Sequence, residues 1–247
     1  MQISSLQTTD TTIPIQQRKK ELDQSFQTMI SEMTERGVGS NYVDKLQENK
    51  TRFLELLTQS EQTMDDAKSK LLQLNHEDRA VLQKVHGLAD EITSDMINGM
   101  SKEGAANLLR MRGDGLDEDN DAFTEVGGAR LFQFPNSNTP DDVASAWEKA
   151  TAGMTAADKM MAQAPMMLSI LTANTSINED GSVNVVKPGE SDFVNPFIQE
   201  DFSWVNWGQE YLDHLEGNQM KMNTGQYFQS RSFVSAFVHN LREPEVA

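Results

Sequence analysis

Three aspartates at alternating positions form the most chemically suggestive pattern in the sequence. Asp117, Asp119 and Asp121 lie in an acidic stretch, and this spacing can present several carboxylates to one hard cation such as calcium. The loop does not match the EF-hand template. Counted from Asp117, its sixth residue is Ala122 where the template has glycine, and its twelfth is Gly128 where the template has glutamate. An irregular calcium site is therefore one hypothesis for this loop.

A second register of the same loop also departs from the template. Counting from Asp114 places Glu125 at position twelve, but Leu116 then occupies position three, where a calcium loop needs an oxygen ligand. The favoured alternative is a solvated acidic turn without a metal, with its charge balanced by neighbouring arginines. The candidates for that role are Arg110, Arg112 and Arg130.

Catalytic and transition-metal motifs are absent from the sequence. The helix-spaced pairs His86–Asp90 and Glu210–His214 offer two groups each, whereas a transition-metal site needs three or four ligands. The chain has no cysteine, which excludes disulfides, thiolate ligands and cysteine nucleophiles. We therefore expect a protein that is not an enzyme and that has no cofactor, apart from the calcium of the first hypothesis.

Four methionines are concentrated in one stretch of predicted helix: Met160, Met161, Met166 and Met167. Methionine is flexible and polarisable, so such residues can fill gaps in a core or form an adaptable docking surface. We favour the core and keep the docking surface as the alternative.

Apolar residues at alternating steps of three and four organise the first half of the chain. This spacing predicts helices over 15–36, 41–74 and 78–97. Gly37 suits the end of the first helix, and the short connection at 75–77 makes the next two helices antiparallel neighbours. Ser101 is the expected N-cap of a further short helix.

Some of the large apolar residues are candidates for contact with a partner molecule. They lie at seam positions for which the chain has no evident counterpart, or are tryptophans that would mark an interface if exposed. These candidate interface residues are Phe53, Leu57, Met64, Trp204 and Trp207.

The second half mixes helices with short strands. Asp180-Gly181 suits the turn of a β-hairpin over 175–186. Thr155 is placed to cap a helix that Pro165 is expected to kink or split. The other predicted elements are a strand over 131–134 and helices over 139–153, 209–215 and 226–241.

These elements predict a mainly α protein with three regions. A flexible polar N-terminus covers 1–14, and an antiparallel helical hairpin within a three-helix coiled-coil bundle covers 15–110. A mixed helical region with a small antiparallel sheet covers 111–247. The net charge of −17 disfavours direct binding to nucleic acid or to an anionic membrane face. No apolar run approaches the roughly 18 residues of a transmembrane helix, so we expect no transmembrane segment. The heptad seams and the absence of catalytic motifs predict a protein partner or a homo-oligomer.

The layout resembles that of the needle-tip proteins of type III secretion systems. The corresponding stretches are 1–12, 41–97, 175–186 and 226–241, and the last is shorter than the long closing helix of that family. The resemblance implies a non-enzymatic structural protein, exported by a type III-like route, virulence or flagellar, with the polar N-terminus as its signal. The alternatives are a bacteriophage virion assembly or structural protein, and a hydrolase or calcium-dependent binding module centred on 114–125. Outside export or a particle, the location would be cytoplasmic.

Overall fold

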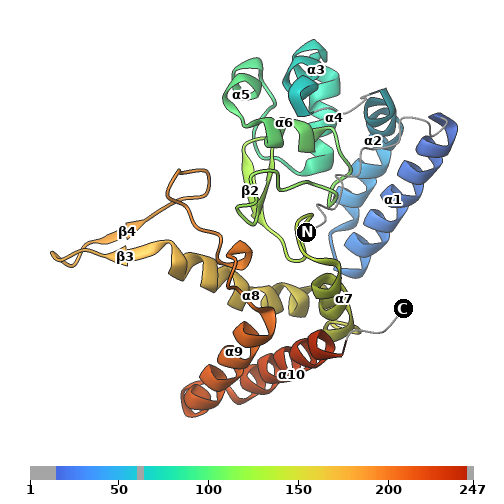
Figure 1. Cartoon of the computed structure of the whole chain (residues 1–247). Coiled ribbons are helices and arrows are strands. Elements are labelled where there is room, and N and C mark those ends of the chain that lie inside the picture. The colour runs from blue at the N-terminus through green and yellow to red at the C-terminus, as the bar shows by residue number, and fades with distance from the viewer. Residues whose placement is uncertain (1–14, 60–63, 244–247) are drawn as a thin grey trace, which may run out of the picture. The chain divides into compact units, whose positions relative to one another are not determined.

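The chain is mainly helical, with two small β-hairpins, as the sequence predicts. The computed structural model describes residues 15–59 and 64–243, which contain ten α-helices, three short 3-10 helices and two two-stranded sheets (Figure 1). The flexible start predicted for 1–14 lies outside the described residues. None of the described helices is both long and apolar enough to cross a membrane.

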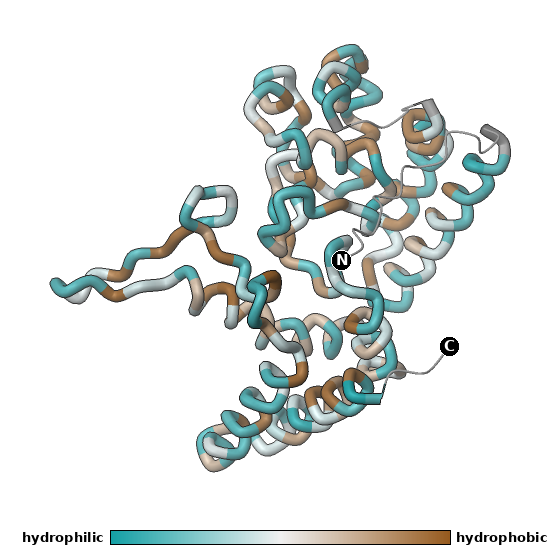
Figure 2. The backbone as a smooth tube through the Cα atoms, viewed as in Figure 1, coloured by the Kyte–Doolittle hydropathy of each residue, from teal (hydrophilic) through white to brown (hydrophobic). Residues whose placement is uncertain are grey.

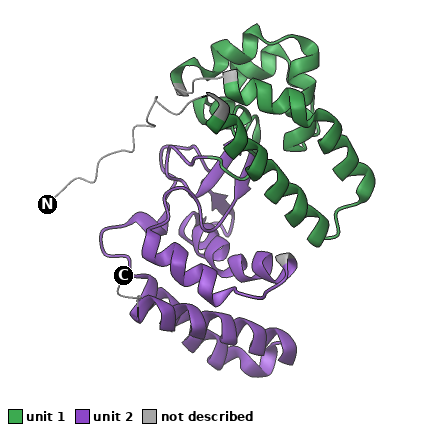
Figure 3. Cartoon of the chain, turned by 90° about the vertical axis from the view of Figure 1, so that its right-hand side faces the viewer, with its two compact units in different colours: residues 1–115, 126–129 green, residues 116–125, 130–247 purple. Residues whose placement is uncertain are grey.

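The described residues divide into two compact units (Figure 3). Unit 1 contains those up to Gly115 together with Val126–Ala129, and unit 2 contains Leu116–Glu125 and those from Arg130 onward. The helices of unit 1 are α1 (Ile15–Glu35), α2 (Ser40–Gln59), η1 (Met64–Asp66), α3 (Ala67–Gln73), α4 (His76–His86), α5 (Ser94–Gly99) and α6 (Lys102–Leu108).

The long helix predicted over 41–74 is replaced by α2 and α3, with the 3-10 turn η1 before α3. The two helices also have different neighbours, because α2 packs against α1 and α4 while α3 packs against α5 and α6. Heptad spacing predicts which side of a helix is buried, but it does not require one continuous helix or one continuous partner. The buried apolar positions of α2 and α3 were therefore predicted correctly, whereas the prediction of one continuous helix was wrong.

The return helix predicted over 78–97 is also shorter than expected. Helix α4 begins after Asn75, whose side chain accepts a hydrogen bond from the Asp78 amide at 2.8 Å. It ends at Gly87, which adopts a φ of +70° while the Leu88 amide donates to the Gln83 carbonyl. Chain direction changes there, and α5 and α6 follow as separate short helices. Ser101 caps α6 as predicted, accepting from the Gly104 amide at 2.8 Å.

Unit 2 is built around aromatic residues. Its elements are most of the hairpin β1 (Phe123–Val126) and β2 (Ala129–Phe132), α7 (Asp141–Ala150), α8 (Ala156–Ala173), β3 (Thr175–Ile177), β4 (Val183–Val185), η2 (Pro196–Ile198), α9 (Trp204–Asn218), η3 (Gln219–Lys221) and α10 (Thr224–Arg242). Helix α10 packs against α7 and α9, and Trp147 contacts Phe233 and Phe237 edge-on. These rings form the centre of the second core.

Two details of unit 2 differ from the sequence-based prediction. The strand expected at 131–134 is β2, which ends at Phe132, and its partner β1 was not predicted because it follows directly from the acidic loop. Helix α8 is not split, since it runs through Pro165 from Ala156 to Ala173. Thr155 caps α8 as expected, accepting from the Asp158 amide. The hairpin expected over 175–186 is present as β3 and β4.

Candidate interaction surface and acidic loop

The acidic loop is held together by its own aspartates. Asp117 is buried, and its carboxylate accepts hydrogen bonds from the Asp121 amide at 3.1 Å and the Ala122 amide at 3.0 Å. It also accepts one from the Asn136 side chain at 2.8 Å. The carboxylate thus accepts the hydrogen bonds of backbone amides that have no backbone carbonyl partner in the turn, which is a common structural role of aspartate.

The neighbouring aspartates act in the same way. Asp121 is buried and accepts from the Phe123 amide at 2.7 Å, while the exposed Asp119 accepts from the Asp121 amide at 3.3 Å. Burial raises the pKa of Asp117, and it raises the pKa of Asp121 to about 6. Ala122 has a φ of +73°, where a calcium loop would use glycine.

These contacts give all three aspartates a structural role that needs no metal. Asp119 and Asp121 use one oxygen each for these bonds, so the bonds do not decide between the metal-free turn and a calcium site. Calcium binding stays an untested hypothesis.

Two of the arginines expected from the sequence do act on the loop. Arg130 pairs with Glu125, and its charge opposes the rise in the pKa of Asp121. The charge of Arg110 opposes the rise in the pKa of Asp114 that burial causes.

The interface residues predicted from the sequence mostly serve the cores. Phe53 and Leu57 are fully buried in unit 1, and the Phe53 ring lies 6.3 Å from the Phe26 ring. Trp204 and Trp207 are partly buried in the aromatic cluster of unit 2. Met64 begins η1, but its side chain lies outside the described residues. The heptad seam of α2 is satisfied within the chain, so we no longer assign Phe53 and Leu57 to an interface.

A buried histidine in unit 1 was not recognised from the sequence. The His86 ring lies 5.8 Å from the Phe53 ring, edge-on, and its Nε2 is 3.0 Å from the Leu108 carbonyl oxygen. Nε2 must donate to that oxygen, so the ring is the neutral tautomer protonated at Nε2. Burial lowers the pKa of His86 to about 4. The sequence does contain a signal for this: His86 follows Leu82 by four residues and so lies on the apolar side of the helix, which is typical of a core residue.

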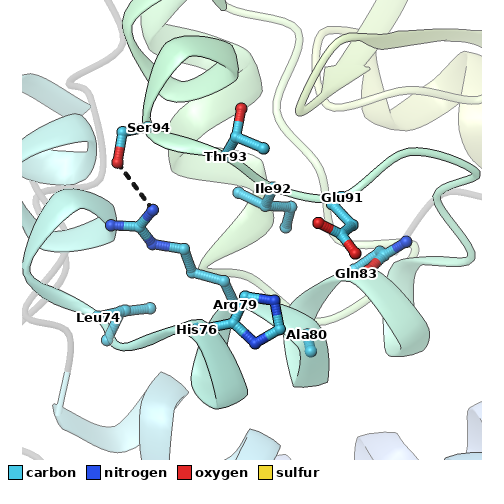
Figure 4. Close-up of a pocket in the computed structure, with 9 residues that line it drawn as sticks. All are labelled: Leu74, His76, Arg79, Ala80, Gln83, Glu91, Ile92, Thr93 and Ser94. Atoms are coloured by element: carbon cyan, nitrogen blue, oxygen red, sulfur yellow. Dashed lines mark hydrogen bonds between the residues drawn. The ribbon is translucent and has the colours of Figure 1, made fainter.

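A cleft of about 320 Å³ in unit 1 is lined by His76, Glu91, Thr93 and Ser94 among others (Figure 4). Its Arg79 donates to the carbonyls of Leu71 and Leu72 and to the Ser94 hydroxyl. Arg79 therefore ties the end of α3 to the start of α5. In the part of the chain that the structure describes, neither the Thr93 nor the Ser94 hydroxyl is hydrogen-bonded to His76 or Glu91; Thr93 instead accepts from the Met96 amide at 3.1 Å.

One side of α8 exposes a row of apolar residues. Met160, Met161 and Leu168 have 66%, 57% and 59% of their surface exposed. At 100° per residue, they and four other exposed apolar residues lie within about 60° of one direction, on one side of the helix. We call this side the α8 strip. It consists of Ala157, Met160, Met161, Ala164, Met167, Leu168 and Leu171.

The opposite side of α8 is firmly anchored in unit 2. Met166 and Ile170 are fully buried, and the Ser169 hydroxyl accepts a hydrogen bond from the Trp207 indole at 3.0 Å. The core role that we favoured for the methionines is thus correct for Met166 only. The other three lie on the α8 strip, so the rotation of α8 is fixed by burial of one side while the methionine-rich side stays uncovered.

The β3–β4 hairpin, which follows α8 in the chain, also exposes apolar residues. Ile177 pairs with Val183, and Thr175 pairs with Val185, so these four side chains share one face of the hairpin. Ile177 and Val183 are 76% and 62% exposed, and Figure 2 shows apolar colouring in parts of both strands. A two-stranded hairpin that is exposed on both faces is only marginally stable alone.

Comparison of the chain with models of protein families, with curated proteins and with solved structures gives no match.

Proposed function

We propose that this protein is a non-enzymatic binding component, and that it acts by placing the α8 strip against a helix of a protein partner. The observation that carries the proposal is the strip itself, whose seven apolar residues are all exposed on a helix of 18 residues. Contiguous exposed apolar surface of this kind is a mark of interaction sites. An assembly component, whether exported or built into a particle, would use such a surface to join its neighbours.

The composition of the strip supports contact with protein. Its large side chains are methionine and leucine, which adapt to the shape of an opposing apolar surface. Their spacing by steps of three and four is that of a helix that packs lengthwise against another helix. Exposed apolar residues repeat in this way for almost four turns of α8.

The energy available is of the size that an association requires. Fully burying one large aliphatic or methionine side chain stabilises by about 1.5–3 kcal/mol. The five large residues of the strip are about half exposed, so covering them would contribute roughly 5 kcal/mol from this chain alone. A partner that contributes a similar area would meet the lower part of the association cost of about 4–15 kcal/mol.

The rate at which the strip methionines are oxidised inside the cell tests whether a partner covers the α8 strip there. Cells that make the protein naturally are treated briefly with hydrogen peroxide, and sulfoxide at each methionine is compared with that in the purified, diluted protein. We expect Met160, Met161 and Met167 to be protected in the cell, and Met220, which is 96% exposed, to react equally in both samples. Oxidation of the strip methionines in the cell as fast as that of Met220 would show that the strip is uncovered there, against the proposal.

A further inference from the structure

The α8 strip is symmetric about its central residue. Ala164 lies at the middle, and the other six strip residues occur in pairs at equal distances on either side of it. Three residues away are Met161 and Met167, four away are Met160 and Leu168, and seven away are Ala157 and Leu171. A rotation that exchanges the two ends of the helix therefore places apolar residues on apolar residues throughout.

This symmetry suits two copies of α8 that cross antiparallel at Ala164. The small Ala164 of each copy would face its equivalent where the helices are closest, which permits close approach of the two backbones. On either side, Met160 would lie against Leu168 of the other copy, and the small Ala157 against the large Leu171. A twofold contact of this kind requires a self-complementary surface, and the alternation of small and large residues provides it.

The distribution of charge favours a second copy over a basic partner. The chain carries a net charge of −17, so repulsion between two copies is weakest where a surface has few charged residues. No residue of the strip is charged, and residues 156–187 contain only five charged residues: Asp158, Lys159, Glu179, Asp180 and Lys187. The one acid of α8, Asp158, already accepts hydrogen bonds from Thr155 and Gln229 within unit 2. The strip thus offers no carboxylate to a basic partner.

We infer that the partner of the α8 strip is the α8 strip of a second copy of this chain, in an antiparallel pair with its twofold axis at Ala164. This inference rests on the proposed function and names the partner for it.

Single cysteines test the arrangement cleanly, because the chain has none of its own. Under mild oxidation we expect Ala164→Cys to form a disulfide-linked dimer. Ala157→Cys alone and Leu171→Cys alone should stay uncrosslinked, because equivalent residues at 157 or 171 would be about 21 Å apart along the pair. An equimolar mixture of these two variants should crosslink, since 157 of one copy faces 171 of the other and disulfides need Cα atoms within about 7 Å.

Crosslinking of Ala157→Cys with itself and of Leu171→Cys with itself would overturn the antiparallel pair in favour of a parallel one. Leu168→Glu should weaken the association at least tenfold, because it buries an unpaired charge against Met160 of the other copy. Lys159→Gln is the matched control, since it changes the net charge equally at an exposed residue of α8 outside the strip, and it should leave the association within about twofold.

Methionine oxidation of the purified protein separates failure of this inference from failure of the proposed function. A single-chain mass with Met160 and Met161 oxidising as fast as Met220 would overturn the second copy as partner, and the strip would remain free for another protein. A single-chain mass with Met160 and Met161 protected would overturn both, because the strip would then be covered within its own chain.

Discussion

The buried histidine of unit 1 makes an acid-sensitive element of the fold. His86 donates from Nε2 to the Leu108 carbonyl, and burial lowers its pKa to about 4. In the unfolded chain its pKa returns to about 6.5. Between these values the unfolded state binds a proton that the folded state excludes, so the stability of unit 1 falls as pH decreases through this window. At 1.36 kcal/mol for each pKa unit, the loss amounts to about 3 kcal/mol when pH reaches 4.

Unit 2 should respond in the opposite sense over the same window. Burial raises the pKa of Asp121 to about 6, above its ordinary value. The folded state therefore binds a proton before the unfolded state does, and the stability of unit 2 rises as pH falls from about 6 toward 4. Acid should consequently lower the urea midpoint of unit 1 relative to the urea midpoint of unit 2.

The positions of the tryptophans allow the two units to be followed separately. All three tryptophans lie in unit 2, at 147, 204 and 207, whereas helices of both units contribute to far-ultraviolet circular dichroism. In urea titrations at about pH 7 and about pH 4.5, we expect circular dichroism alone to gain an early transition at the lower pH. His86→Gln is the control, because a glutamine amide can donate to the same carbonyl without titrating. If this variant shows the same acid-induced transition, or if both signals shift together, the assignment to His86 is refuted.

Three further predictions concern the acidic loop and one close backbone contact. Asp117→Asn should destabilise unit 2 by about 1–3 kcal/mol in urea titrations followed by tryptophan fluorescence, because an asparagine has one acceptor oxygen where the carboxylate accepts from three donors. The control is Asp119→Asn, at an exposed residue that accepts one longer hydrogen bond, and it should cost less than half as much. Equal losses of stability in the two variants would contradict this prediction. Millimolar calcium should leave the thermal midpoint unchanged, and a rise that Asp117→Asn abolishes would restore the calcium hypothesis. Gly104→Ala should destabilise unit 1 by more than about 1 kcal/mol, measured by circular dichroism, because the Cβ of the alanine would lie 2.2 Å from the Gly127 carbonyl oxygen. The control is Gly99→Ala, whose Cβ would have no atom within 4 Å, and it should be neutral or stabilising.

Local signals in the sequence predicted much of the fold correctly. The Asp180-Gly181 turn, the Thr155 and Ser101 caps and the glycine after α1 each act through contacts within a few residues, and each is found in the structure. The continuous return helix predicted over 78–97 was wrong because apolar spacing was given more weight than Gly87. That glycine ends α4 through its positive φ, and beyond it Ile92 lies in a loop while Met96 lies in α5.

The candidate surface was harder to predict from the sequence for a physical reason. An apolar helix face has the same pattern whether it is covered or exposed, so spacing alone cannot separate Phe53, which is buried, from Met160, which is not. What decides is which side the rest of the fold covers. For α8 that side is set by contacts far apart in sequence, such as the hydrogen bond from Trp207 to Ser169.

The mass of the protein in solution tests most directly whether the α8 strip joins two copies. Light scattering on the intact chain, over a wide range of concentrations, should give the mass of two chains for the natural sequence and for Lys159→Gln. Leu168→Glu should give the mass of one chain at the same concentrations while keeping its circular dichroism spectrum. A single-chain mass for the natural sequence throughout, or a two-chain mass that Leu168→Glu leaves unchanged, would contradict the pairing of two copies through the α8 strip.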